Sequence, residues 1–193
     1  MKKERVLVPE NIRELKAYVP GKTIAEVEQE YKPHRISKLA SNENRLGRSS
    51  KVDDAVSKAL KTVHDYPDPE SRKLRAAIAS RYSVSEDRIV VGAGSESMLA
   101  GLCQSFFLNK ENLITADATF IGVFVQAKIR GIKVKRIPLT NDFRFDVKGM
   151  VNAIDDQTKM LYIANPNNPT GTYISKDRKS TRLNSSHLVI SYA

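Results

Sequence analysis

Features of secreted and membrane proteins are scarce in this sequence. Its 193 residues include a single cysteine, Cys103, which excludes an internal disulfide and fits a reducing compartment. No apolar run approaches the roughly 20 residues that span a bilayer. The short apolar run 6–8 before Pro9 is too small for the core of a signal peptide. These absences predict a soluble cytoplasmic protein.

Positive charge is abundant but is not concentrated in one place. Lys and Arg number 32 against 22 Asp and Glu, a formal net charge of +10 that raises the question of nucleic-acid binding. The basic residues are interleaved with acidic ones, and no basic run alternates with aromatic residues. Solvated helix faces explain such a pattern, so we expect neither a nucleic-acid nor a membrane partner. A non-catalytic basic binding module stays open as a remote alternative.

The first part of the chain reads as an arm followed by helices. Residues 1–45 are punctuated by proline and contain one short expected helix over 24–29. A helix is expected from Lys51, where apolar residues recur at helical spacing. Asp68-Pro69 then predicts an N-cap and a first-turn proline for the next helix. The buried stripe expected on that helix consists of Leu74, Ile78 and Tyr82.

Strands and helices alternate in the rest of the chain. Such alternation with short connections is typical of a mostly parallel sheet covered by helices, so the sequence predicts an α/β fold. The expected strands are 88–91, 113–115, 132–137 and 160–164, and the expected helices are 95–108, 119–130 and 146–154.

Three loops that follow expected strands carry candidate ligand-binding residues. In open α/β sheets ligands bind at the carboxyl ends of the strands. Gly92–Ser97 opens a helix, whose free N–H groups and positive end suit a phosphate, although a capped Gly-rich turn is the alternative. Phe120 can stack on a planar ring or pack in the core. Asn168, in the loop 164–171, can bond a ring hydroxyl or satisfy its own turn.

The order and spacing of these blocks resemble the pyridoxal-phosphate (PLP) aminotransferases of fold type I, class I/II. The string Asn165–Gly171 is similar to a signature of that family. From Ile36 to Lys176 the chain looks like its histidinol-phosphate aminotransferase branch. The other similar blocks are Tyr18–Gly21, Lys38–Asn44, Tyr66–Pro69 and Ser71–Arg75.

The resemblance implies PLP as the cofactor and assigns a role to several residues. Gly94, Ser95 and Glu96 would hold the cofactor phosphate through backbone and hydroxyl groups. Phe120 would stack on the pyridine ring, and Asn168 would bond its O3′ atom. No residue is expected to bind a metal ion.

The resemblance also implies substrates and a partner. The reaction would move an amino group from L-histidinol phosphate to the 2-oxo acid 2-oxoglutarate in histidine biosynthesis, with Tyr18 and Asn42 near the substrate. In a homodimer of the complete enzyme, Tyr66 would reach the cofactor phosphate of the neighbouring subunit. Departures from the family pattern keep an aromatic amino acid or cobalamin-pathway-like aminotransferase open as the alternative; they are Arg45, Glu96-Ser97 and Ala118.

The same resemblance sets the expected domain boundaries. Residues 1–45 would be an N-terminal arm with a small-domain segment, and 46–176 the first part of the large PLP-binding domain. Residues 177–193 resemble the in-frame translation of a sequencing adapter, so we expect a non-native tail. The family's Schiff-base lysine lies beyond this point, so we assign no catalytic residue and expect a truncated, inactive fragment.

Overall fold

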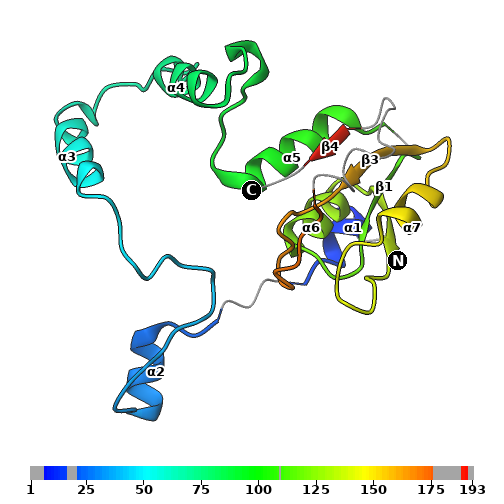
Figure 1. Ribbon diagram of the computed structural model, residues 1–193, viewed down its shortest axis with the longest axis horizontal. Coiled ribbons are helices and arrows are strands. Elements are labelled where there is room, and N and C mark those ends of the chain that lie inside the picture. The colour runs from blue at the N-terminus through cyan, green and yellow to red at the C-terminus, as the bar shows by residue number, and fades with distance from the viewer. Residues whose placement is uncertain (1–6, 17–20, 109, 176–187, 191–193) are drawn as a thin grey trace, which may run out of the picture. The chain divides into compact units, whose positions relative to one another are not determined.

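The computed structural model describes residues 7–16, 21–108, 110–175 and 188–190, and the chain forms two compact units. One unit comprises Met1–Leu15 with Val91–Ala193, and the other comprises Lys16–Val90 (Figure 1). No helix in the described ranges has the length and apolar character needed to cross a bilayer.

A parallel sheet forms the centre of the first unit. Its strands are β1 (Asn112–Ala116), β2 (Lys133–Ile137), β3 (Thr158–Tyr162) and β4 (Leu188–Ile190), arranged in the order β2-β1-β3-β4. All pairs are parallel, and every residue of β1 is buried, since β1 lies between β2 and β3 and has a hydrophobic core on each face. The chain moves from β1 to β2 on one side and returns past β1 to β3. The strand order therefore reverses at β1, which in such sheets marks the ligand-binding edge.

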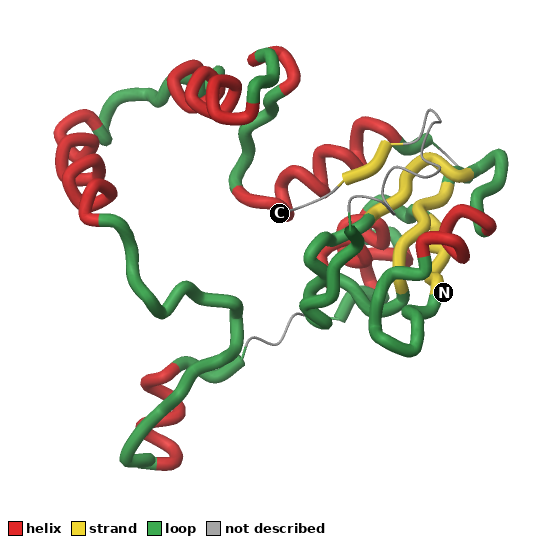
Figure 2. Tube along the Cα trace, in the orientation of Figure 1, coloured by secondary structure: helices red, strands yellow, loops and turns green. Residues whose placement is uncertain are grey.

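Helices cover both faces of this sheet. α5 (Gly94–Phe106) and α6 (Ile121–Ile129) contact each other on one face, and the short α7 (Val147–Asn152) packs on the other (Figure 2). Side chains alternate along β1, so Leu113 enters the core below α5 and α6 while Ile114 enters the core below α7. Strands buried on both faces read as continuous apolar runs, which explains the run that ends at Ala164.

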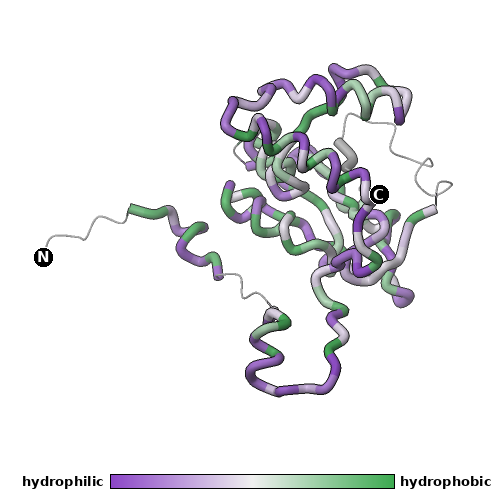
Figure 3. Tube along the Cα trace, turned by 90° about the vertical axis from the view of Figure 1, so that its left-hand side faces the viewer, coloured by the Kyte–Doolittle hydropathy of each residue, from purple (hydrophilic) through white to green (hydrophobic). Residues whose placement is uncertain are grey.

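The second unit consists of helices without a core. They are α2 (Ile24–Tyr31), α3 (Ser50–Ala59), η1 (Leu60–Thr62), α4 (Arg72–Tyr82) and η2 (Glu86–Arg88). Local signals begin two of them: Thr23 and Glu26 form a capping box for α2, and Ser49 caps α3. Polar and apolar residues follow one another along these helices (Figure 3). None of the described residues of this unit is buried, so local propensity and capping account for its helices.

Two details of α4 differ from expectation. The carboxylate of Asp68 accepts hydrogen bonds from the backbone N–H groups of Glu70 and Arg72, at 3.1 and 2.9 Å, and α4 begins only at Arg72. Asp68 therefore closes a turn before the helix instead of capping it. The expected buried stripe is also wrong, since Leu74 and Tyr82 are 50% and 68% exposed. Ile78, the third residue of the stripe, is only partly buried.

The expected strand 88–91 is wrong as well. Residue 88 ends η2, and the stretch up to α5 is loop (Figure 2). A strand needs a hydrogen-bonded neighbour, and no described strand pairs with this stretch. The remaining expected elements are present with shifted ends; for example, the strand expected at 160–164 is β3 at Thr158–Tyr162.

Besides η2, two further elements were not expected. α1 (Glu10–Arg13) precedes Glu14, which forms an ion pair with Lys128 at 3.0 Å, and Asn11 Nδ2 donates to the carbonyls of residues 128 and 129. The beginning of the expected arm thus packs on α6. β4 falls within 177–193 and pairs with β3, Leu188 opposite Met160. The expected boundaries at 45 and 176 stay predictions.

The only cysteine offers a test of the first unit. Cys103 is 1% exposed on α5, and burial raises the pKa of its thiol. We expect a thiol reagent to label it at least about 100-fold more slowly in native buffer than in denaturant, because labelling requires local opening. Absorbance of the released thiol product measures both rates. Rapid, complete labelling in native buffer would contradict the packing of α5 on the sheet.

The amino-terminal end of β1 offers a pH-dependent test. The carboxylate of Asp155 accepts hydrogen bonds from Lys135 Nζ, Asn112 Nδ2 and Thr158 Oγ1 at 2.6, 3.0 and 2.8 Å. These donors, Lys135 first, hold its pKa well below the ordinary value of 3.8. A depressed pKa stabilises the folded state at neutral pH, and this contribution disappears as the pH falls below the ordinary value.

We therefore expect Asp155→Asn to be less stable than wild type at pH 7 and the difference to shrink as the pH falls below 3.8. Urea unfolding at several pH values measures it. Asp156→Asn is the matched control, because the side chain of Asp156 makes no hydrogen bond within the described ranges. Equal losses in both variants at neutral pH would show that the hydrogen bonds of Asp155 contribute nothing specific.

Candidate site at the carboxyl edge of the sheet

The loops after β1 and β3 meet at one edge of the sheet. β1 and β3 run parallel with Ile114 opposite Leu161, so their carboxyl ends lie together. The loop 117–120 follows β1 and leads into α6, and the loop 163–171 follows β3. The loops that carry Phe120 and Asn168 therefore reach the same edge.

The side chain of Asn167 joins the two central loops. It is 3% exposed, and its Oδ1 accepts a hydrogen bond from Thr119 Oγ1 at 2.8 Å. Its Nδ2 donates to the carbonyl of Ala118 at 3.1 Å and to Thr170 Oγ1 at 2.9 Å. The backbone of Asn167 also bonds Thr172 and Gly171, at 2.8 and 2.7 Å. One buried amide thus connects residues 48 positions apart in the sequence.

The same hydrogen bonds continue to the loop after β2. Thr170 Oγ1 and Thr172 Oγ1 lie 2.9 Å apart, and Thr172 Oγ1 donates to the carbonyl of Phe143 at 2.7 Å. Because each hydroxyl has one proton, Thr170 donates to Thr172. The series therefore runs in one direction, from Asn167 through the two threonines to Phe143. All three strand-end loops are linked by it.

Asn168 lies next to this buried amide but faces outward. It is exposed, and its side chain makes no hydrogen bond within the described ranges. The alternative that Asn168 satisfies its own turn is therefore wrong: the neighbouring Asn167 does so. The amide of Asn168 remains available to a ligand, and its bond to a cofactor oxygen stays a prediction.

Phe120 combines packing with partial exposure. It directly precedes α6, and its ring packs against the core cluster that contains Leu99 and Val123. Gly122 leaves space for the ring, since a Cβ atom there would lie 2.4 Å from Phe120 Cε1. The packing alternative is thus confirmed, and stacking on a cofactor ring stays a prediction for the part of Phe120 that is exposed.

The beginning of α5 is open to solvent. Gly94 has a φ of +80°, a conformation that favours glycine, and the side chains of Ser95 and Glu96 are exposed. No side chain caps the helix; Ser97 Oγ instead donates to the carbonyl of Gly94 at 3.0 Å. The first N–H groups of α5 therefore lack a side-chain acceptor, which is the condition for anion binding at a helix end.

The remaining predicted site residues belong elsewhere. Asn42 and Tyr66 are exposed residues of the second unit, Asn42 with a φ of +50° and Tyr66 with its side chain fully in solvent. Tyr18 lies outside the described residues. The roles of these three residues stay predictions.

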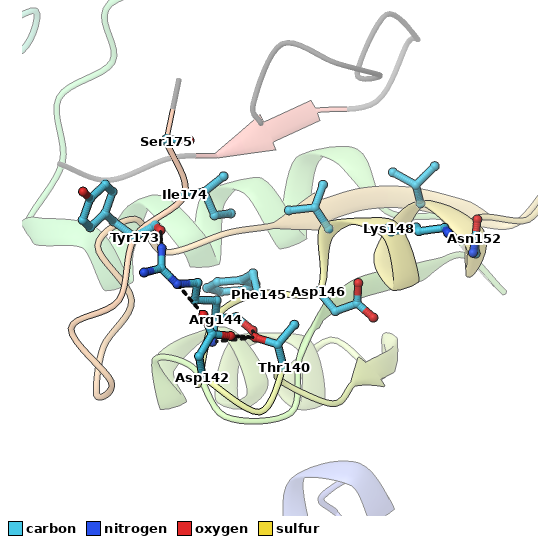
Figure 4. Close-up of a pocket in the computed structure, with 12 residues that line it drawn as sticks. Thr140, Asp142, Arg144, Phe145, Asp146, Lys148, Asn152, Tyr173, Ile174 and Ser175 are labelled. Carbon is cyan, nitrogen blue, oxygen red and sulfur yellow. Dashed lines mark hydrogen bonds and ion pairs between the residues drawn. The ribbon is translucent and has the colours of Figure 1, made fainter. Parts of the chain in front are cut away.

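A cavity of about 850 Å³ lies beside α7 (Figure 4). Arg144 lies at its wall, paired with Asp142 at 2.7 Å and with its guanidinium 5.8 Å from the ring centre of Tyr173. None of the predicted cofactor residues lines it. Phe120 packs in the core below α5 and α6, whereas the cavity borders the core below α7. We therefore place the candidate site at the carboxyl edge, where hydrogen bonds join the loops.

Sequence reasoning missed the residues that hold this edge together. They are Thr119, Asn167, Thr170 and Thr172. The adjacent pair Asn167-Asn168 could have indicated such a residue, because two neighbouring side chains in a turn usually point in different directions and so have different surroundings. The sequence pattern alone did not reveal which of them is buried.

The fold and this edge define a member of a known enzyme family. The family model for aminotransferase class I and II matches residues 35–180, and the chain belongs to this family. It is 40% identical over 177 residues to a histidinol-phosphate aminotransferase of Bacillus velezensis, covering 92% of this chain and 49% of that protein. A histidinol-phosphate aminotransferase of Geobacillus is 41% identical over 172 residues, covering 89% and 47%. The chain spans about half the length of the curated relatives it matches.

Solved structures agree with this family. The histidinol-phosphate aminotransferase of Clostridium acetobutylicum aligns with a TM-score of 0.64 and 26% identity, over 72% of this chain and 40% of that one. The enzyme of Sinorhizobium meliloti, solved with pyridoxal-5′-phosphate, aligns with a TM-score of 0.78 over 93% and 48%; at 21% identity it shows the fold alone. The predicted α/β aminotransferase fold is confirmed.

The contact between Gly122 and Phe120 predicts the effect of one added methyl group. In Gly122→Ala the Cβ atom would overlap the Phe120 ring, so the ring must move. We expect a loss of about 1–3 kcal/mol in the free energy of unfolding, measured with urea. Gly101→Ala is the control, since it meets nothing within 4 Å on α5, and we expect it to gain up to about 1 kcal/mol from helix propensity. Equal stability of the two variants would refute the close packing of Phe120.

Proposed function

We propose that this chain is the amino-terminal part of a PLP-dependent aminotransferase that transfers an amino group from L-histidinol phosphate to 2-oxoglutarate. The observation that carries the proposal is the meeting of the loops after β1 and β3 at one sheet edge, joined by hydrogen bonds, in a chain of this family. The identity of about 40% to histidinol-phosphate aminotransferases supports the choice within the family.

The residues at the edge fit the chemistry of PLP. The open beginning of α5, with Gly94 at positive φ, suits a phosphate group. The partly exposed ring of Phe120 suits an aromatic ring, and the unpaired amide of Asn168 suits a phenolic oxygen. PLP has one of each of these groups.

Bound there, PLP supplies an electron sink for the carbon that loses its proton during transamination. The N–H groups at the start of α5 and the hydroxyl of Ser95 bind the phosphate; a helix end contributes about 0.3–1 kcal/mol to such an interaction when exposed. Phe120 would stack on one face of the cofactor ring. Asn168 Nδ2 donates to the ring oxygen and stabilises negative charge there.

The finer assignments rest on the relatives and on the sequence resemblance. They are the cytoplasmic location, the part in histidine biosynthesis, and a homodimer in which Tyr66 reaches the neighbouring cofactor phosphate. Tyr18 and Asn42 would contact the substrate. An aromatic amino acid or cobalamin-pathway-like aminotransferase is the alternative, because Arg45, Glu96-Ser97 and Ala118 depart from the usual pattern.

Donor preference of the full-length protein encoded at this locus tests the proposal. We expect kcat/KM for L-histidinol phosphate, with 2-oxoglutarate as acceptor, to exceed that for aromatic amino acids by about 100-fold or more, equal to about 2.7 kcal/mol of transition-state binding. A coupled assay of glutamate formation measures it. Preference for an aromatic amino acid would select the alternative, and no transamination with any donor would refute the proposal.

A further inference from the structure

The two residues proposed to hold the cofactor ring come from separate loops that no backbone hydrogen bond joins in the described part of the chain. Phe120 follows β1 and Asn168 follows β3. Phe120 and Asn168 can contact the same planar ring only if the two loops keep a fixed distance from each other. The residues that fix this distance are therefore part of the site.

We propose that Asn167 is a positioning residue that fixes Phe120 and Asn168 relative to each other, with Thr119 as its partner. The inference deepens the proposed function, on which it rests. Asn167 itself faces inward at 3% exposure and touches no ligand.

The hydrogen bonds between the two loops are made by the residues that directly precede Phe120 and Asn168. Asn167 Oδ1 accepts from Thr119 Oγ1 at 2.8 Å, and Asn167 Nδ2 donates to the Ala118 carbonyl at 3.1 Å. Thr119 directly precedes Phe120, and Asn167 directly precedes Asn168. Each proposed ligand-binding residue is thus one peptide bond away from a residue held by the hydrogen bond between Thr119 and Asn167. Thr119 is itself buried, with 7% exposure.

The turn that carries Asn168 is closed around the same residue. The carbonyl of Asn167 accepts from the Gly171 N–H at 2.7 Å, and the Asn167 N–H donates to the Thr172 carbonyl at 2.8 Å. Nδ2 of Asn167 also donates to Thr170 Oγ1 at 2.9 Å. Backbone and side chain of Asn167 therefore hold both ends of the turn that exposes Asn168.

The amide group is specifically required because one end accepts and the other donates. An aspartate would keep the bond from Thr119 but would lose both donations, and it would face the Ala118 carbonyl with negative charge. An alanine would leave the buried Thr119 hydroxyl and the part-buried Ala118 carbonyl without this partner.

The first test needs no ligand. Backbone order parameters from NMR relaxation should be near 0.85, the usual value for rigid backbone, at Phe120 and Asn168 in the whole chain. In Asn167→Ala and in Thr119→Val we expect both to fall toward about 0.6, whereas Thr119→Ser, which keeps the hydroxyl, should retain the wild-type values. Mobile wild-type loops, or unchanged values in both variants, would overturn the proposal.

The second test asks whether the spacing matters to a ligand. Calorimetric titrations use pyridoxine 5′-phosphate, which has no aldehyde to react with lysines, and its analogue without the 3-hydroxyl group. We expect wild type to prefer the hydroxylated ligand about 10-fold, as one hydrogen bond supplies. Asn168→Ala should abolish this ratio by removing the contact. Asn167→Ala should reduce the ratio below about 2-fold although Asn168 is still present.

A matched control separates positioning from general stability. Asn112 is also fully buried and hydrogen-bonded, but it lies at the opposite end of β1. Asn112→Ala should lower the melting temperature while keeping the ratio near its wild-type value. An unchanged ratio in Asn167→Ala would overturn the proposal. If wild type binds neither ligand, the proposed cofactor site fails, and the order parameters still decide whether Asn167 fixes the loops.

Discussion

The hydrogen bonds of Asn167 are the constraint on which the carboxyl edge depends. Parallel strands cannot be joined by a tight turn, so the loops after β1 and β3 are far apart in sequence. In the described part of the chain, the connection between these loops comes from a side chain. Asn167 supplies it at 2.8 and 3.1 Å, and the threonines carry the connection on to the loop after β2. A buried, fully satisfied polar group of this kind specifies one arrangement of its neighbours.

This edge can be well defined because the sheet below it has a core on both faces. Leu113 and Ile114, adjacent on β1, enter different cores and are each 0% exposed. Thr115 Oγ1 donates to the carbonyl of Tyr162 at 2.9 Å, which ties the last residues of β1 and β3 before the loops begin. The second unit lacks such support, and its described residues include none that is buried. Two of its helices, α2 and α3, are stabilised locally by capping residues.

The sequence predicted what depends on local periodicity and missed what depends on neighbours. α5 and the strands β1 to β3 follow from apolar patterns, and the structure contains them within a few residues of their expected ends. The stretch 88–91 has a strand-like composition, but a strand also needs a partner. Asp68 has the residue type of an N-cap, yet its carboxylate bonds two N–H groups before the helix. Composition alone does not distinguish these outcomes.

The side chains of Asn167 and Asn168 show that sequence-based prediction has the same limit for site residues. Asn167 and Asn168 have identical side chains, and burial alone separates their roles. A buried amide that uses both its donor and its acceptor cannot also bind a ligand, whereas the exposed one can. The hydrogen bonds between the loops join residues of the chain itself, so they order the loops without using a contact to a ligand. In the proposed site, positioning and contact are thereby divided between two neighbouring residues, so we expect the replacement of either one to remove a different property of the site.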